Sequence, residues 1–355
     1  MLSVIHILSS LNVGGAERVT MELVQVQRAQ GLDAQILSLG SGQDFLIETA
    51  QAEGIPVTVS ATENSRWSRY REILAHVKKF DVVHVHSPRA LIFIAPLVPL
   101  FTNTRVIYTR HGLEALASLK WKLLHIAMRP FIDYITFVAH SGRDAFMANH
   151  RWNKDKTRVV SNGVYVSNKP APAVSRPVRF GSVGRMVELK GQPILLDAVA
   201  ALAEKFGEAS PEMFRLLFFG AGPMEPTLRE QASKLPPGIV EFCGEVPDVD
   251  AIYEQIDVLV VASRSEGLSM VIMEAMARAK PAVATDVGGS STLVKTDQTG
   301  TLVPYGDSNI LCEAMEQLVN NTELVERYGQ AAIELIRAEF SLENAHHCYL
   351  ECYQG

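Results

Sequence analysis

The chain has 355 residues, too many for one typical domain, and its 47% hydrophobic and 20% charged residues describe an ordinary soluble globular protein. Residues 1–168 carry 18 Lys and Arg against 13 Asp and Glu, whereas residues 169–355 carry 15 against 26, so a basic half precedes an acidic one. The net charge of −6 and the lack of a basic, aromatic-interleaved motif argue against a nucleic-acid partner, whereas the basic half either faces an anionic membrane surface or acceptor or is simply solvated.

Short apolar strands alternate with helical patterns along the first half, which is typical of an open, doubly wound parallel sheet. The strands that we expect are Ser3–Leu8, Asp33–Ser38, Val57–Val59, Val82–His86, Arg105–Thr109, Tyr134–Val138 and Thr157–Val160. The helical patterns are Ala16–Gln30, Arg69–Lys79 and Lys120–Phe131. The proline-rich stretch 169–177 has no periodicity and predicts an interdomain linker.

The same alternation restarts after the linker and indicates a second domain. Its expected strands are Arg179–Val183, Arg215–Phe219, Ile239–Phe242, Val258–Ala262 and Ala282–Thr285. Its expected helices are Gln192–Phe206, Met224–Ser233, Val271–Ala279, Ile310–Val319 and Thr322–Glu339. We therefore predict an α/β fold of two doubly wound, Rossmann-like domains, residues 1–168 and 178–339, that face a central cleft. Because ligands of open α/β sheets bind at the carboxyl ends of the strands, we expect the ligands to bind in that cleft.

Targeting signals and cysteines bear on the location of the protein. The segment Met1–Leu8 has no basic leader or cleavage site and predicts a buried first strand rather than a signal peptide. The longest apolar run, Ala90–Phe101, is shorter than the roughly 20 residues that span a bilayer and predicts a buried crossover helix. The chain has few cysteines for its length: Cys243, Cys312, Cys348 and Cys352. We expect a cytoplasmic protein, peripheral at most at the inner face of the plasma membrane.

Two loops of the first domain carry candidate ligand-binding residues. Gly14 and Gly15 precede a helix, so the backbone can approach a phosphate at that helix start. His111 directly follows a strand and is expected at its carboxyl end, facing the cleft. His84 and His86 share one face of a strand. With no third ligand nearby in the sequence, they are more often packed histidines than metal ligands.

The stretch from Ser118 to Pro130 is amphipathic and basic and contains Trp121. One interpretation is a helix that lies on a membrane surface. The other, slightly favoured, is a core-packing helix whose lysines extend to solvent.

In the second domain, Gly184, Arg185 and Lys190 occupy one loop between a strand and a helix. Two cations in such a loop can neutralise a diphosphate. Gly222 belongs to a tight turn that we expect to line a nucleotide pocket. The turn is not a dinucleotide fingerprint because the third glycine is missing. A base is expected to lie against the loop that contains Val246.

The most informative motif pairs two carboxylates, Glu266 and Glu274, across the start of a helix. Between them, Gly267, Leu268 and Ser269 leave backbone N–H groups free at that start. A helix N-terminus binds phosphate and a carboxylate nearby binds sugar hydroxyls, so the motif suits a sugar nucleotide.

Together these motifs resemble the family-four retaining glycosyltransferases of GT-B fold (group 1 glycosyl transferases), of the bacterial surface-polysaccharide type. The resemblance covers nearly the whole chain, including residues 340–355, which in the family form a helix that crosses back to the first domain. The motifs that carry it are, in chain order, Gly14-Gly15, Arg185-x4-Lys190 and Glu266-x7-Glu274.

The resemblance implies a role for each charged residue of these motifs. Arg185 and Lys190 would hold the donor diphosphate, which stabilises the charge that develops as the anomeric C–O bond breaks. Glu274 would bind the ribose hydroxyls, and Glu266 would contact the transferred sugar.

Further roles follow from the same resemblance. The backbone of Gly267, Leu268 and Ser269 would complete the phosphate cradle, and Gly15 would approach the diphosphate from the first domain. His111 would help to place the donor sugar. Asn162 lies in a loop that is common in the family.

The implied activity is transfer of a hexose-type sugar, with retention of anomeric configuration, from a UDP-linked donor to a glycan or lipid-linked acceptor in lipopolysaccharide, capsule or exopolysaccharide synthesis. The resemblance implies no cofactor and no divalent metal, and Asp248-Val249-Asp250 is interpreted as a helix N-cap rather than a metal loop. The alternatives are a GT-B sugar-nucleotide epimerase and a non-catalytic sugar-nucleotide-binding subunit.

Overall fold

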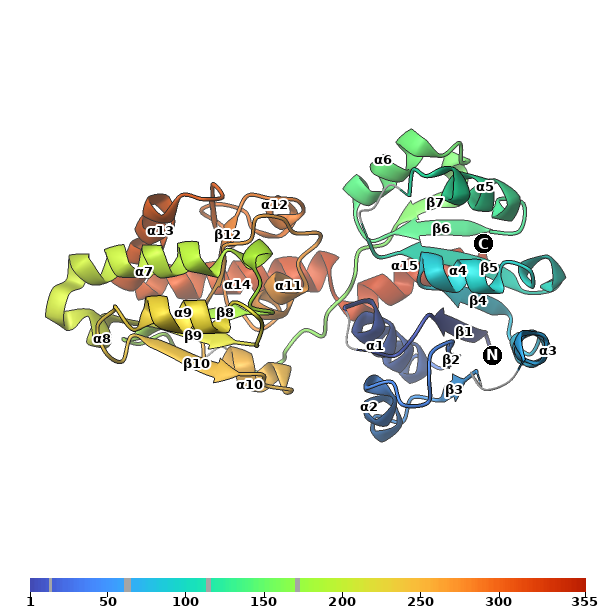
Figure 1. Ribbon diagram of the computed structural model, residues 1–355, viewed down its shortest axis with the longest axis horizontal. Helices are drawn as coiled ribbons and strands as arrows, with labels where there is room; N and C mark the ends of the chain where they lie inside the picture. The colour runs from blue at the N-terminus through green and yellow to red at the C-terminus, as the bar shows by residue number, and fades with distance from the viewer. Residues whose placement is uncertain (13–14, 61–64, 113–115, 170–172) are drawn as a thin grey trace. The chain divides into compact units, whose positions relative to one another are not determined.

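The computed structural model describes residues 1–12, 15–60, 65–112, 116–169 and 173–355 (Figure 1). The chain divides into two compact units, one made of Met1–Gly163 and Ser341–Gly355 and the other of Val164–Phe340. Residues 164–177, which the sequence assigns to the first domain and a linker, belong to the second unit, and residues 170–172 among them lie outside the described residues.

The first unit is built on a parallel sheet, seven-stranded within the described residues, in the order β3-β2-β1-β4-β5-β6-β7. The order reverses between β1 and β4, as in doubly wound folds. The elements are β1 (Ser3–Leu8), α1 (Gly15–Ala29), β2 (Asp33–Ser38), α2 (Leu46–Ala52), β3 (Val57–Val59), α3 (Arg66–Val77), β4 (Val82–Val85), α4 (Pro88–Ile94), η1 (Val98–Leu100), β5 (Arg105–Arg110), α5 (Leu119–Met128), β6 (Tyr134–Phe137), α6 (His140–Asn149), η2 (Lys154–Lys156), β7 (Thr157–Val159) and α15 (Leu342–Gln354).

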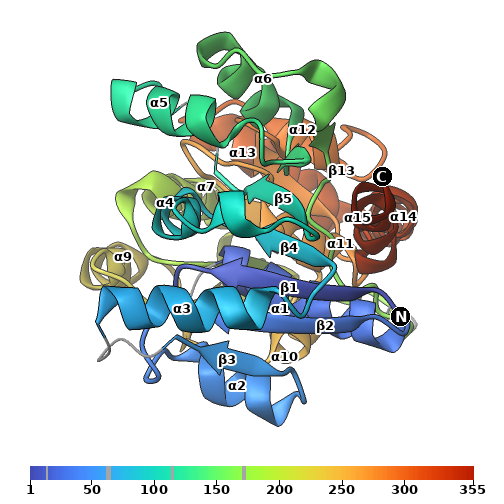
Figure 2. The same ribbon diagram turned by 90° about the vertical axis from the view of Figure 1, so that its right-hand side faces the viewer.

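Helices cover both faces of this sheet, so its central strands are buried on both sides, as the four buried residues of β4 show. Residues of α3, α4, α5 and α6 pack in one core on one face. Residues of α1, α2 and α15 pack in two clusters on the other. Figure 2 shows α3 and α4 in front of the strands.

The C-terminal helix α15 belongs to the first unit, as predicted. Ser341 caps it by accepting a hydrogen bond from the Asn344 N–H. Tyr349 and Tyr353 pack against strand residues such as Ile107 in a core of buried side chains. The last helix therefore completes the packing of the first sheet.

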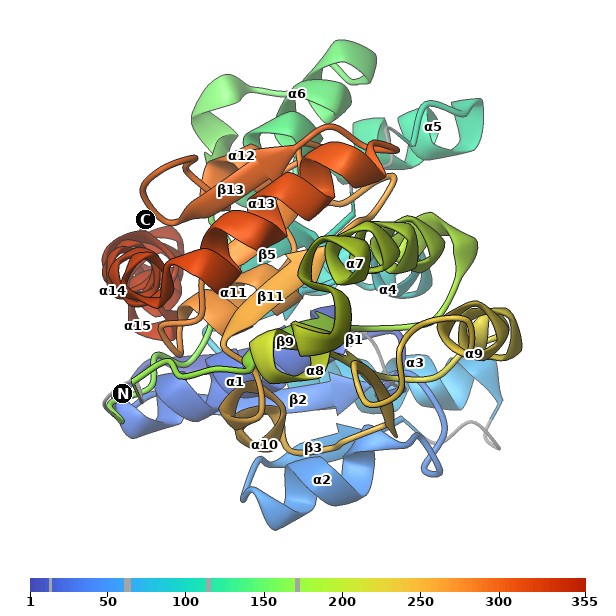
Figure 3. The same ribbon diagram turned by 90° about the vertical axis from the view of Figure 1, so that its left-hand side faces the viewer.

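The second unit repeats the doubly wound plan with a sheet, six-stranded within the described residues, in the order β10-β9-β8-β11-β12-β13. Residues of α7, α9 and α13 pack on one face and those of α10, α11 and α12 on the other (Figure 3). The elements are β8 (Val178–Val183), η3 (Glu188–Lys190), α7 (Gln192–Phe206), η4 (Gly207–Ala209), α8 (Ser210–Met213), β9 (Phe214–Phe219), α9 (Glu225–Ala232), β10 (Val240–Gly244), α10 (Val249–Glu254), β11 (Val258–Val261), α11 (Met270–Met276), β12 (Ala282–Thr285), α12 (Ser290–Leu293), β13 (Gly300–Val303), α13 (Ser308–Asn320) and α14 (Thr322–Glu339).

One expected element is corrected by the structure. The apolar run Ala90–Phe101 does not form a single crossover helix but splits into α4 and the short η1. Pro96 and Pro99 lie in this run, and proline lacks the N–H that a helix interior needs. Within the described residues, no helix is both long and apolar enough to cross a membrane.

Candidate active site

Two loops of the second unit flank the point where its strand order reverses. One follows β8 and contains residues 184–191, and the other follows β11 and contains residues 262–269. The Arg264 N–H donates a hydrogen bond to the Leu189 carbonyl at 2.8 Å, which ties the loops together. Gly191 has φ +63°, and a Cβ there would lie 2.0 Å from the Ala262 carbonyl oxygen. Glycine is therefore required for this approach.

The loops bring Lys190 and Glu266 into an ion pair, with 2.8 Å between Nζ and Oε1. The Ser263 hydroxyl donates to the same carboxylate oxygen at 2.6 Å. The Lys190 side chain is 26% exposed and that of Glu266 is 9% exposed, so the pair lies just below the surface. Arg185, on the first loop, is exposed. The two residues that the sequence assigns to diphosphate and sugar are thus in direct contact.

Glu274 lies on α11, in the second turn after Ser269, the residue at the helix N-cap. Its carboxylate accepts a hydrogen bond from the Tyr253 hydroxyl at 3.0 Å. Burial, followed by the nearby Glu274 charge, raises the pKa of Tyr253 well above its usual value, so the hydroxyl remains a donor. Tyr253 therefore fixes the Glu274 side chain from the protein side.

The double glycine after β12 supports the Glu266 loop. Gly288 has φ +57°, and a Cβ on it would lie 1.7 Å from the Glu266 carbonyl oxygen. The Gly289 N–H donates to the Gly267 carbonyl at 3.1 Å. Both glycines are therefore needed where the loop after β12 meets the Glu266 loop.

Gly222 has a similar structural role beside the β8 loop. A Cβ added to Gly222 would lie 2.4 Å from the carbonyl oxygen of Met186. The Met186 N–H donates a hydrogen bond to the Ala221 carbonyl at 2.9 Å. Gly184 adopts φ +135°, while Val246 is partly buried against the core. Contact of Gly222, Gly184 or Val246 with a nucleotide remains a prediction.

The described candidate residues of the first unit lie at a helix start or in loops that follow strands. Gly15 begins α1 with open space where a Cβ would be, and Gly14 lies outside the described residues. Intramolecular crowding therefore does not explain Gly15. Asn162 and Gly163 follow β7 in sequence, and a Cβ on Gly163 would lie 2.6 Å from the Ser341 carbonyl oxygen, so this loop packs against the start of α15.

His111 follows β5 and is joined to a chain of buried histidines. Its Nε2 lies 3.1 Å from Nδ1 of His86, whose Nε2 lies 2.8 Å from Nδ1 of His6. The Nε2 of His6 lies 2.7 Å from Oε1 of Gln27. His6 is the third histidine of the group that contains His84 and His86. It is distant from them in the sequence but pairs in register with His84 on the neighbouring strand.

His84 connects this chain to the C-terminal helix. Its Nδ1 lies 2.7 Å from the Tyr353 hydroxyl and its Nε2 2.6 Å from the Thr109 hydroxyl. Gln27 donates to the same Tyr353 oxygen at 3.1 Å. The network therefore joins β1, α1, β4, β5 and α15.

One ring nitrogen from each of His6, His84 and His86 lies within 4.8 Å of the other two, close enough to consider a metal site. All six ring nitrogens of these histidines already have hydrogen-bond partners, so a metal would have to displace some of them. Hydrogen bonding accounts for the arrangement of the three rings.

A neutral imidazole has one donor and one acceptor nitrogen, so one hydrogen bond sets the next. With Oε1 of Gln27 as an acceptor, His6 carries its proton on Nε2 and accepts on Nδ1. His86 then donates from Nε2 and accepts on Nδ1, and His111 donates from Nε2. The order of tautomers is thereby fixed along the chain.

Burial keeps these histidines neutral. It lowers the pKa of His6 to about 4 and also that of His111 to about 4, in the latter case against a partial rise from the neighbouring Asn162 side chain. Burial also lowers the pKa values of His84 and His86 well below their usual range, and the neighbouring histidines add to the effect.

Two family models match most of the chain. Glycosyltransferase Family 4 matches residues 13–168, and Glycosyl transferases group 1 matches residues 177–321. The chain belongs to the group 1, family-four glycosyltransferases.

Relatives and solved structures match nearly the whole chain of the glycosyltransferase. It is 29% identical to a phosphatidyl-myo-inositol mannosyltransferase of Mycobacterium leprae, over 91% of this chain and 88% of the relative. It is 25% identical to the D-rhamnosyltransferase WbpZ of Pseudomonas aeruginosa, over 94% and 90%. The crystal structure of HepE from Anabaena in complex with UDP matches 99% of both chains with a TM-score of 0.82 at 18% identity, which supports the GT-B fold.

Two side chains that contact the candidate carboxylates were not predicted. Ser263 and Tyr253 hold Glu266 and Glu274, respectively. Ser263 lies three residues before its partner, a short-range signal, but no sequence pattern connects Tyr253 to α11. The N-cap interpretation of Asp248 is confirmed, since its side chain accepts from the Asp250 N–H at 2.9 Å.

Proposed function

We propose that this glycosyltransferase moves a hexose-type sugar from a UDP-linked donor to a glycan or lipid-linked acceptor, with retention of configuration and without a divalent metal. The observation that carries the proposal is the Lys190–Glu266 pair at the strand-order reversal of the second unit, with Glu274 on the helix that follows. The cations suit the diphosphate of a nucleotide sugar, and the carboxylates suit the hydroxyls of its ribose and its sugar.

In this proposal the donor rearranges the existing contacts. Lys190 leaves Glu266 for the diphosphate, where Arg185 joins it as a second cation. Glu266, still held by Ser263, becomes available to hydroxyls of the transferred sugar. Glu274 binds the ribose. The cations then stabilise the diphosphate most as its charge develops, which makes them catalytic rather than merely binding.

The anomeric configuration is retained if the acceptor hydroxyl attacks the anomeric carbon from the same face that the leaving diphosphate occupies. The anomeric carbon gains a bond to the acceptor oxygen as its bond to the diphosphate oxygen breaks. The acceptor proton passes to that diphosphate oxygen, so the step needs no protein base. Glu266 does not act as a nucleophile here because it is engaged with the sugar hydroxyls.

The choice of donor and acceptor is supported by similar proteins. Solved structures of HepE contain UDP, UDP with glucose, and UDP-glucose. One relative, 24% identical over 90% of both chains, is a Campylobacter jejuni N-acetyl-D-galactosaminyltransferase whose name specifies an undecaprenyl-diphosphate-linked acceptor. Another is a lipopolysaccharide core mannosyltransferase of Rhizobium leguminosarum, 35% identical over 29% of this chain.

The test is a panel of UDP-, GDP- and dTDP-sugars, read first by thermal stabilisation and then by turnover with lipid-linked and soluble glycan acceptors. We expect a UDP-sugar to stabilise the protein, EDTA to leave turnover intact, and the product to keep the donor's anomeric configuration. Abolition of turnover by EDTA, or an inverted product, would contradict the proposal. Release of an altered sugar nucleotide without acceptor would favour the epimerase.

A further inference from the structure

Helix α5 of the first unit has an outward face that the fold does not use. Only His125 and Met128 of this helix are buried. Leu119, Leu123 and Ile126 are 71%, 57% and 66% exposed, respectively. Their spacing of four and three residues places them on one stripe of the helix. Isolated exposed aliphatic residues are ordinary, but a contiguous stripe marks an interaction surface.

Basic residues border this stripe on both sides. With 3.6 residues per turn, Lys120 lies on one flank of the stripe and Lys122 and Arg129 on the other. The buried His125 and Met128 face the opposite way. The sequence offered a membrane-surface helix and a core-packing helix as alternatives, and α5 has a face suited to each.

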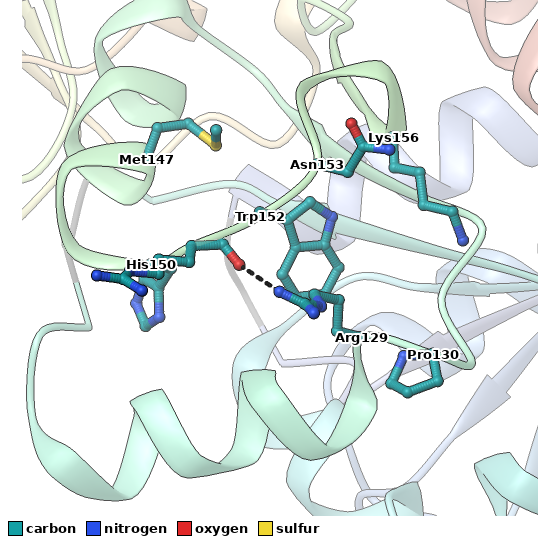
Figure 4. A pocket seen from close by; sticks show the side chains of 8 residues that line it. Arg129, Pro130, Met147, His150, Trp152, Asn153 and Lys156 are labelled. Atoms are coloured by element: carbon teal, nitrogen blue, oxygen red, sulfur yellow. Dashed lines mark hydrogen bonds between the residues drawn. The ribbon is translucent and has the colours of Figure 1, made fainter.

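The basic flank continues into the groove beside α5 (Figure 4). An open pocket of about 760 Å³ there is lined by Arg129, Arg151, Lys156 and Trp152, among others. Figure 4 shows the Arg129 guanidinium donating to the backbone carbonyl of Arg151, at 3.0 Å. The Lys156 ammonium donates to the Ile132 carbonyl at 3.2 Å. Both cations are thus held in place through neutral backbone acceptors.

Six cations of this region form no ion pair among the described residues. Lys120, Lys122, Arg129, Arg151, Lys154 and Lys156 make no ion pair with any carboxylate of the described residues. An aliphatic stripe flanked by unpaired cations is complementary to one kind of partner: a lipid surface with anionic headgroups, which accepts the side chains at its acyl boundary and the cations at its phosphates.

We propose that α5 and the adjoining groove form a docking surface for an anionic phospholipid bilayer. The aliphatic stripe enters the headgroup region, while Lys122 and Arg129 contact lipid phosphates. The helix has ten residues and inserts no further than the interface, so attachment is peripheral and reversible. This surface is independent of the donor site and does not rest on the proposed activity.

The test is sedimentation of the full chain with vesicles of phosphatidylcholine alone or with 30 mol% phosphatidylglycerol, at low and high salt. We expect binding to the anionic vesicles only, weakened at least tenfold at high salt. The double variant Leu123→Glu with Ile126→Glu should lose at least tenfold in binding, and so should Lys122→Ser with Arg129→Ser. Because the altered side chains are mostly exposed, thermal unfolding should match the parent.

Matched controls lie elsewhere in the same unit. Leu100→Glu replaces another exposed aliphatic residue, 47% exposed, and Lys78→Ser with Lys79→Ser removes two exposed cations at the end of α3. Both controls should bind vesicles as the parent does. Equal binding of parent and α5 variants, equal binding to neutral and anionic vesicles, or no binding at all would overturn the proposal. A parent dimer that Leu123→Glu with Ile126→Glu dissociates would assign the stripe to a second copy of the chain instead.

Discussion

The two units hold their polar side chains in opposite ways. In the second unit Lys190 and Glu266 form a charged pair just below the surface, in loops shaped by glycines. In the first unit His6, His84 and His86 are neutral, buried and saturated with hydrogen bonds. A charged pair near solvent can exchange one partner for a ligand, whereas a saturated buried network stabilises one arrangement of its strands.

The histidine network should give the largest effect, on the pH dependence of stability. Its folded pKa values lie below the unfolded value of 6.5, so its stabilisation is complete above pH 6.5 and is lost as the pH falls towards 4. For His6, with a pKa of about 4, full protonation corresponds to about 3 kcal/mol in the free energy of unfolding. Urea unfolding at a series of pH values measures the loss.

The His6→Gln variant provides the control for this effect, because a glutamine does not titrate. Its stability at pH 7 should be lower, but its decline between pH 6.5 and 4 should be shallower than that of the parent. A parent curve that stays flat over this range would mean that the histidines are not neutralised by burial.

The second-largest effect is expected when the charge of Lys190 is removed, and it should appear in the catalytic activity. Lys190→Ala takes away one cation from the developing diphosphate charge and should reduce kcat about 100-fold. Lys205→Ala, which removes a Lys–Glu pair on the surface of the same unit, is the matched control and should keep parental turnover. Single-turnover kinetics with the best UDP-sugar measures both, and near-normal turnover of Lys190→Ala would remove this residue from the donor site.

A smaller effect is expected where loops meet around Glu266. Gly288→Ala would place a Cβ against the Glu266 carbonyl at a positive φ and should destabilise the unit by about 1–3 kcal/mol. Gly267→Ala, with open space for a Cβ, should keep the parental melting temperature even if it reduces donor binding. Calorimetric unfolding compares the two, and equal melting temperatures would show that the close approach is not maintained in solution.

The contrast between the units also explains what the sequence revealed. The loops that we propose as the donor site could be picked out in the sequence because their residues form contiguous motifs after recognisable strands, as in Glu266-x7-Glu274. The histidine network was not, because His6 and His86 are 80 residues apart, and Gln27 and Tyr353 are 326 apart. Only the adjacency of β1 and β4 and the return of α15 bring them together.

Most of the fold was predictable for a related reason. Long periodic segments such as α7 and α14 match their expected bounds, because each has a continuous apolar stripe. Strand β13 was missed: it has four residues, begins with Gly300, and provides too short a pattern. The outward stripe of α5 was ambiguous because Leu119, Leu123 and Ile126 also suit a core-packing face, and only the burial of His125 and Met128 shows which face points inward.

UDP binding to a Glu274→Ala variant is the sharpest test of the proposed donor site in the second unit. Isothermal titration calorimetry of the parent, Glu274→Ala and the exposed control Glu230→Ala isolates the ribose contact. Loss of a hydrogen bond to a charged group should weaken binding about tenfold or more in Glu274→Ala, with Glu230→Ala unchanged. Parental affinity for UDP in Glu274→Ala would contradict the assignment of this edge as the nucleotide site.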